Sequence, residues 1–114
     1  HVSYSYRDGI YYHILKEGNG REVRLTDTVE VLYKGWLYNN GNIFDQTKER
    51  PVSFPLNRLI RGWQQGLPGT KVGGKIRLWI PAGSAYGIRT FSPQMPPNSI
   101  LVFDVEVLNT RPQN

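Results

Sequence analysis

The feature that most constrains the fold is a two-residue alternation of apolar and polar side chains in three separate segments, residues 28–38, 75–81 and 99–108. In residues 75–81, for example, isoleucine and leucine occupy one side, and arginine and tryptophan occupy the other. A period of two places one side of each segment against a core. We therefore expect strands with one buried face. Residues 10–18 are apolar on both sides, so this strand is expected to be covered on both faces for part of its length.

Turn signals between the alternating segments predict how the strands are connected. Residues 39–42, NNGN, form a hairpin signal because Asn and Gly tolerate positive φ. Residues 43–47 are then expected to return antiparallel to the preceding strand, and residues 50–56, RPVSFPL, form another extended piece.

One stretch, LIRGWQQGLPG (residues 59–69), shows helical spacing instead. It is too short to be stable alone, with a possible cap at Asn57 and an end at Pro68–Gly69. Its apolar residues share one face of about two turns: Leu59, Ile60, Trp63 and Leu67. About five strands with hairpin-type connections and one short helix predict an antiparallel α+β domain. We expect the domain to span residues 10–109, between a tail or lead-in strand at 1–9 and a C-terminal tail at 110–114.

Composition excludes several classes of function. The 114 residues suffice for one core, and no apolar run approaches the roughly 20 residues needed to span a bilayer. The net charge of +5 comes from scattered basic residues, which favours a solvated surface over a nucleic-acid site. The chain does not begin with Met, so we expect processing or trimming, with a targeting segment lost upstream.

The residues that most reactive chemistries require are missing or isolated. There is no cysteine, and neither His1 nor His13 has partners at metal-ligand spacing, so we expect no metal, no cofactor and no nucleophilic triad. GTKVGGK (residues 69–75) has the spacing of a phosphate loop, but Ile76 follows it and a strand pattern continues. We interpret it as a tight loop.

Four motifs, in this order and at this spacing, resemble the FKBP-type peptidyl-prolyl cis-trans isomerases: VLYKGWLYNNGNIFDQT, LIRGWQQGLPGTKVGGK, IPAGSAYG and MPPNSILVFDVEVL. The resemblance covers residues 9–109. The lead-in GIYYHILKEGNG is similar to the bacterial branch of macrophage-infectivity-potentiator-like proteins. The resemblance implies an antiparallel five-stranded sheet, plus the lead-in strand, wrapped around one short helix.

The resemblance also implies a role for each residue that matches the family motifs. Trp63 would be the floor of an apolar pocket that receives a proline ring, and the Ile60 N–H would bind a substrate carbonyl. The expected catalytic residues are Asp45, Tyr86, Phe44, Trp63 and Phe103. The expected substrate-binding residues are Tyr33, Leu59, Ile60, Val52, Phe91 and Met95. Val52 occupies a place where the family often has an aromatic, and Arg50 is the one candidate for a partner opposite Asp45.

The implied function is isomerisation of X–Pro bonds in proline-containing peptides and unfolded client proteins. Macrocycles of the rapamycin or tacrolimus type would bind the same pocket, and a bacterial cell-envelope or periplasmic location is expected. Two alternatives stay open. One is a non-catalytic proline-peptide-binding or chaperone domain, favoured by Val52 and by the segment between Asp45 and Pro51, which is shorter than in well-known relatives. The other is a β-module that binds carbohydrate or nucleic acid through Trp36 and Trp79.

Overall fold

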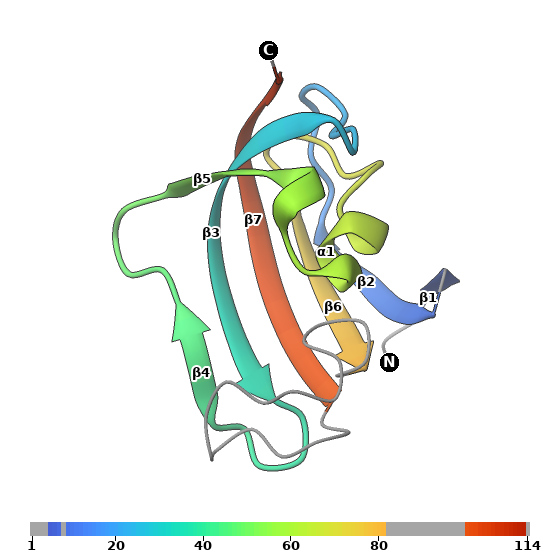
Figure 1. The fold of residues 1–114 in the computed structure, drawn as a ribbon, viewed down its shortest axis with the longest axis vertical. Coiled ribbons are helices and arrows are strands. Elements are labelled where there is room, and N and C mark those ends of the chain that lie inside the picture. Colours follow the sequence, from blue (N-terminus) through green and yellow to red (C-terminus); the bar gives the residue numbers. More distant parts are fainter. Residues whose placement is uncertain (1–4, 8, 82–99, 114) are drawn as a thin grey trace.

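The computed structural model describes residues 5–7, 9–81 and 100–113. These residues form strands and two short helical segments (Figure 1). The strands are β1 (Ser5–Arg7), β2 (Ile10–Lys16), β3 (Asp27–Leu37), β4 (Ile43–Gln46), β5 (Val52–Pro55), β6 (Lys75–Pro81) and β7 (Ile100–Pro112). A 3-10 helix, η1 (Leu56–Arg58), leads into the single described α-helix, α1 (Arg61–Gly66). The tight loop expected at residues 69–75 is confirmed, because β6 begins at Lys75.

The described strands form one antiparallel sheet in the order β1-β2-β6-β7-β3-β4, and β5 also pairs with β3. The expected fold is confirmed: an antiparallel sheet with one short helix on its face. Two details bring the described strands to seven. β1 is the lead-in strand, and the segment that returns along β3 is split into β4 and β5 by residues 47–51. The expected hairpin at 39–42 connects β3 to β4, with Gly41 at φ 74°.

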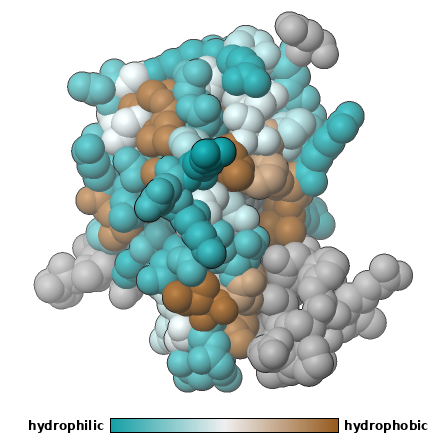
Figure 2. All heavy atoms as spheres, turned by 90° about the vertical axis from the view of Figure 1, so that its left-hand side faces the viewer, coloured by the Kyte–Doolittle hydropathy of each residue, from teal (hydrophilic) through white to brown (hydrophobic). Residues whose placement is uncertain are grey.

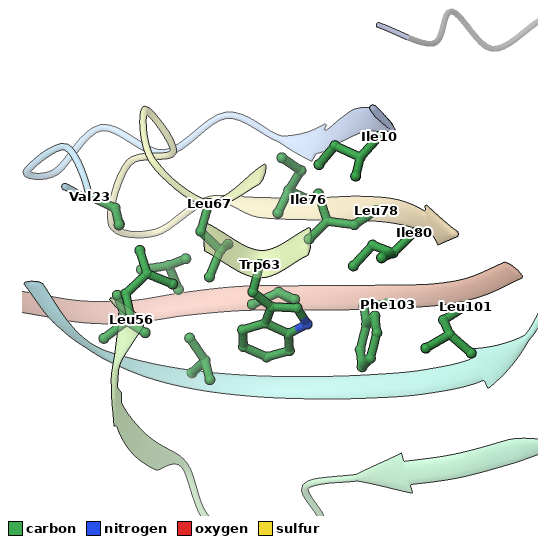
Figure 3. Close-up of a cluster of buried hydrophobic side chains, with 14 of the residues drawn as sticks. Ile10, Val23, Leu56, Trp63, Leu67, Ile76, Leu78, Ile80, Leu101 and Phe103 are labelled. Atoms are coloured by element: carbon green, nitrogen blue, oxygen red, sulfur yellow. The ribbon is translucent and has the colours of Figure 1, made fainter. Parts of the chain in front are cut away.

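The core lies between α1 and the inner face of the sheet (Figure 3). The alternation of β6 and β7 determines that face, since their inward residues are almost completely buried. The core residues on these two strands are Ile76, Leu78, Ile80, Leu101, Phe103, Val105 and Val107. Leu67 and Trp63 meet them from the helix side.

Two glycines allow α1 to lie directly against the sheet. A Cβ on Gly62 would lie 2.5 Å from side-chain atoms of Ile80, and one on Gly66 would lie 2.5 Å from Leu78. Real Cβ atoms do not approach other atoms so closely, so any side chain here would push the helix outward. The indole of Trp63, on the same helix, is thereby held at the depth of the core.

The structure differs from three sequence-based expectations. β2 is covered at Ile10, but Tyr11 is 53% exposed and Leu15 is 38% exposed, so the strand is not buried on both faces. The N-cap of α1 is Ile60 rather than Asn57, which lies in η1 and does not cap α1. β7 continues past the expected boundary at Asn109 to Pro112, because its end pairs with the start of β3.

Candidate active site

A pocket of about 200 Å³ opens beside α1. Its described lining is mostly apolar and comes from β3, β4, β5, β7 and the start of the helix: Tyr33, Asp45, Phe54, Leu59, Ile60, Trp63 and Phe103. All of these except Phe54 are residues that the sequence predicts for the site. An apolar cavity of about 150 Å³ in another protein admits benzene. The volume therefore suits a five-membered pyrrolidine ring.

Trp63 lies at the base of this pocket. It projects from α1 toward β7 and β3, beside Phe103 (Figure 3), and only 4% of it is exposed. The rings of Tyr33 and Phe103 meet it edge to face, with centroids at 5.2 Å and 5.5 Å. Phe54 does the same from a third direction at 6.4 Å. These perpendicular contacts are favourable for aromatic pairs and hold the indole in one orientation.

Phe44 supports the pocket wall from behind. Its ring packs perpendicular to Phe103 at 5.4 Å, although it is not among the lining residues. Gly35 makes room for this pair, because a Cβ there would lie 2.8 Å from the Phe103 ring and 2.9 Å from the Phe44 ring. The sequence predicts Phe44 as a site residue, and the structure places it one layer outside the lining.

The polar rim is formed by Asp45 and Tyr33. The Tyr33 hydroxyl donates a hydrogen bond of 2.7 Å to Asp45 Oδ2. Asp45 is exposed and is the one charged group among the described lining residues. The described residues include no ion pair between Asp45 and Arg50, which lines a different depression. A short hydrogen bond at the mouth therefore orients the carboxylate.

The turn before α1 contributes Leu59 and Ile60 to the pocket lining. Ile60 lines the pocket, and its carbonyl accepts hydrogen bonds from the N–H groups of Trp63 and Gln64. Gln64 Nε2 also donates to the Leu59 carbonyl at 2.6 Å. These three hydrogen bonds hold residues 59 and 60 against the helix. Gln64 was not predicted from the sequence.

Phe54 occupies the place in the pocket lining that the sequence analysis assigns to Val52. Phe54 lines the pocket, whereas Val52 does not. Val52 instead lies in an adjoining depression of about 470 Å³, formed with Tyr33 and the residues from Gln46 to Arg50. Side chains two residues apart on a strand point to the same side of the sheet. Phe54 therefore lies on the same side of β5 as Val52, one step nearer to α1. Tyr86, Phe91 and Met95 lie outside the described residues.

A larger apolar depression, of about 360 Å³, lies at another place on the molecule. Its described lining is Gly9, Tyr11, Tyr38, Trp79, Pro81 and Ile100. No charged side chain lies among these residues, and the depression borders segments outside the described residues. The smaller pocket combines a fixed aromatic base with an oriented carboxylate, so we place the candidate site there.

The match to a family model decides what this arrangement is. Residues 19–108 match the model described as FKBP-type peptidyl-prolyl cis-trans isomerase. The chain belongs to this family. The FKBP match runs from before β3 to Leu108 in β7 and includes α1 and every described residue that lines the pocket. The chain therefore contains an FKBP-type domain.

Relatives with known names agree with this assignment. The chain is 46% identical to FkpA of Escherichia coli over 91% of its length, which is 38% of FkpA. It is 44% identical to a probable FKBP-type isomerase of Haemophilus influenzae, with 95% and 45% covered. It thus spans less than half of these relatives. The crystal structure of FkpA superimposes with a TM-score of 0.81 (90% of this chain, 48% of FkpA). An isomerase structure from Pseudomonas syringae gives 0.85 at 37% identity, with 93% and 77% covered.

The two tryptophans considered for sugar or nucleic-acid stacking lie outside this pocket. Trp36 is half-buried, and its ring is approached by Lys34 Nζ at 5.8 Å and by the Arg77 guanidinium at 5.4 Å. Arg77 in turn binds both carboxylate oxygens of Asp104. Trp79 is also half-buried. The Trp36 ring is therefore approached by neighbouring cations, whereas Trp79 lines the apolar depression of about 360 Å³.

Proposed function

We propose that this FKBP domain accelerates X–Pro rotation by receiving the proline ring on the indole of Trp63. The observation that carries the proposal is the apolar pocket of about 200 Å³ with a rigidly held tryptophan at its base. The aromatic wall that Val52 does not supply comes from Phe54. The absence of an aromatic at Val52 is therefore no longer an argument for a non-catalytic proline-binding domain.

The rate enhancement that the pocket must supply is modest. The amide bond rotates over a barrier of about 18–20 kcal/mol, and uncatalysed exchange takes roughly 10–100 s. Exchange in milliseconds needs about 10⁴-fold acceleration, which corresponds to about 5–6 kcal/mol. Rotation breaks no covalent bond, so neither a nucleophile nor a metal is needed for it.

Desolvation of the substrate amide provides part of this energy. A planar amide carries negative charge on oxygen and positive charge on nitrogen, and it loses this separation when it twists. The aromatic walls exclude water that would otherwise solvate the planar form. The pocket therefore raises the energy of the planar ground state more than that of the twisted transition state.

Hydrogen bonds specific to the twisted state provide the remainder. The Ile60 N–H is the donor on the helix side, within the turn that Gln64 closes. The Tyr86 hydroxyl is the second proposed donor. The Asp45 carboxylate, oriented by Tyr33, supplies the negative field beside the rotating amide. Phe91 and Met95 would cover the bound ring.

The proposal extends to ligands and context. Unfolded client proteins would bind through exposed prolines, and rapamycin- or tacrolimus-type macrocycles would occupy the same pocket. FkpA and the other bacterial relatives support placement in the macrophage-infectivity-potentiator-like branch and in the bacterial cell envelope. Among the described residues, no helix is long and apolar enough to cross a membrane.

A peptide isomerisation assay tests the proposed function directly. The chain should catalyse exchange of an X–Pro peptide, and Asp45→Ala and Tyr86→Phe should reduce kcat/KM. Glu17→Ala, which removes an exposed carboxylate far from the pocket lining, is the matched control. Rapamycin should cause a saturable change in tryptophan fluorescence that Tyr33→Ala abolishes. Binding of rapamycin without any turnover would favour the non-catalytic domain instead.

A further inference from the structure

We propose that Thr47 is a positioning residue, whose hydroxyl holds Tyr33 and thereby aims the Asp45 carboxylate at the pocket. This inference rests on the proposed function and deepens it. Thr47 follows the last residue of β4 and does not line the pocket of Trp63. It would act on the reaction only through other residues.

Thr47 binds both backbone groups of Tyr33. The Thr47 N–H donates to the Tyr33 carbonyl at 2.9 Å, and the Tyr33 N–H donates to Thr47 Oγ1 at 2.9 Å. The Thr47 hydroxyl donates back to the Tyr33 carbonyl at 3.2 Å. In an ordinary hydrogen-bonded antiparallel pair, the second of these bonds would end on the main-chain carbonyl of the partner residue. Here the side-chain oxygen takes its place.

This substitution has a geometric consequence for the end of β4. Because Oγ1 accepts the Tyr33 N–H, the main chain at Thr47 is free to leave β3 and enter residues 48–51. The pairing with β3 is therefore extended by one residue while the strand itself ends at Gln46.

Figure 2 views the side of the molecule that carries β4 and β5, where hydrophilic residues predominate.

Tyr33 is consequently bound at both of its ends. Its backbone is held by Thr47, and its hydroxyl is held by Asp45 at 2.7 Å. Asp45 itself lies on β4, a strand of four residues with a register shift opposite Gly35 and Trp36. So short an edge strand has few ladder bonds of its own. The hydrogen bonds of Thr47 attach β4 to β3 at the end of β4 that lies nearest to Asp45.

Two substitutions separate the hydroxyl from the shape of the side chain. Thr47→Val keeps the volume and the β-branch but removes the donor and the acceptor, whereas Thr47→Ser keeps the hydroxyl. Thr28→Val is the matched control, because Thr28 also lies on a β3 pairing position, opposite Pro55 and Arg111, and is not among the residues that line the pocket. Melting temperature, kcat/KM and hydrogen exchange of the Tyr33 amide are measured for each.

We expect Thr47→Val to lower kcat/KM by roughly five- to tenfold and to expose the Tyr33 amide to exchange, at a temperature where the variant is fully folded. Thr47→Ser should stay within about twofold of the parent chain, and Thr28→Val should not change the rate. In an Asp45→Ala background, Thr47→Val should have less than about a twofold further effect, since the group that it positions is gone.

Each contrary result has a distinct meaning. Full activity of Thr47→Val, or equal losses with and without Asp45, would overturn the positioning role while leaving the isomerase function intact. A loss in Thr47→Ser as large as in Thr47→Val would show that packing matters rather than the hydroxyl. An inactive parent chain would overturn the proposed function and this inference together.

Discussion

Asp45 and Trp63 show how single residues divide the work of the pocket. The indole is buried and held by three perpendicular rings, so it determines shape. The carboxylate is exposed and held by one hydroxyl, so it determines the local field. Substitutions at these two kinds of position should therefore separate stability from rate.

Asp45→Ala should lower the isomerisation rate by about tenfold and leave the melting temperature within about 2 °C. Asp45 is exposed, and the Tyr33 hydroxyl that it binds can donate to water instead. Peptide exchange kinetics and thermal unfolding of the same sample check both parts. A fall in melting temperature as large as that of a core variant would assign Asp45 a structural role.

Phe103→Ala should destabilise the domain by about 3–5 kcal/mol and abolish binding of proline ligands. Its ring is 3% exposed and contacts Trp63 on one side and Phe44 on the other, so its removal opens a cavity between them. Urea unfolding and macrocycle titration measure the two losses. Phe103→Leu, which fills more of the space, should recover much of the stability and little of the binding.

Most of the pocket could be predicted residue by residue because its members fall inside motifs that keep their spacing. Phe54 could not, because it belongs to a short extended piece without such a motif. The alternation in VSF offers a signal after the fact, since residues two apart share a side. The hydroxyl bridge of Thr47 gives no sequence signal at all, because it depends on where β4 leaves β3.

At the scale of elements, α1 lies close to the sheet because Gly62 and Gly66 carry no side chain where the helix meets Ile80 and Leu78. The helix has six residues and no side-chain cap, so it is not stable by itself. Packing against β6 and β2 supplies what propensity does not. The spacing of apolar residues correctly indicated the helix. The predicted cap at Asn57 was wrong because that residue lies inside η1.

Gly62→Ala should destabilise the domain by about 1–3 kcal/mol, although alanine is the better helix former by roughly 1 kcal/mol. The added methyl would lie 2.5 Å from two carbons of Ile80, so α1 must shift. Arg61→Ala, at an exposed position of the same helix, is the control and should keep the melting temperature. The loss should shrink when Ile80 is also alanine; an unchanged loss would point to the backbone instead.

At the scale of the whole molecule, one buried carboxylate joins segments that are distant in sequence. Asp27 is 1% exposed and accepts hydrogen bonds from the Arg24 N–H and from Thr110 Oγ1. Arg21 binds its other oxygen at 3.3 Å, and Gln113 donates to its backbone carbonyl. The loop before β3 and the end of β7 are thus fastened together. This explains why residues 110–112 belong to the sheet rather than to a tail.

Asp27→Asn should lower the free energy of unfolding by about 2 kcal/mol, because the amide loses the charge and turns one acceptor into a donor. Arg21 is 43% exposed, so the loss should stay below that of a fully buried pair. Denaturant unfolding measures the change, with Glu17→Gln as an exposed control. Isomerase activity per folded molecule should not change, since Asp27 lies far from the pocket lining.

Residues 48–51, between β4 and β5, form a connection whose sequence can be changed without altering the sheet. Residues 48–51 take no part in the pairing of β3 with β7, yet three of them border a hollow that shares Tyr33 with the pocket of Trp63. Replacement of a surface connection costs little closure entropy. Grafting other sequences into this window offers a way to retune which neighbours of proline are accepted, without redesign of the scaffold.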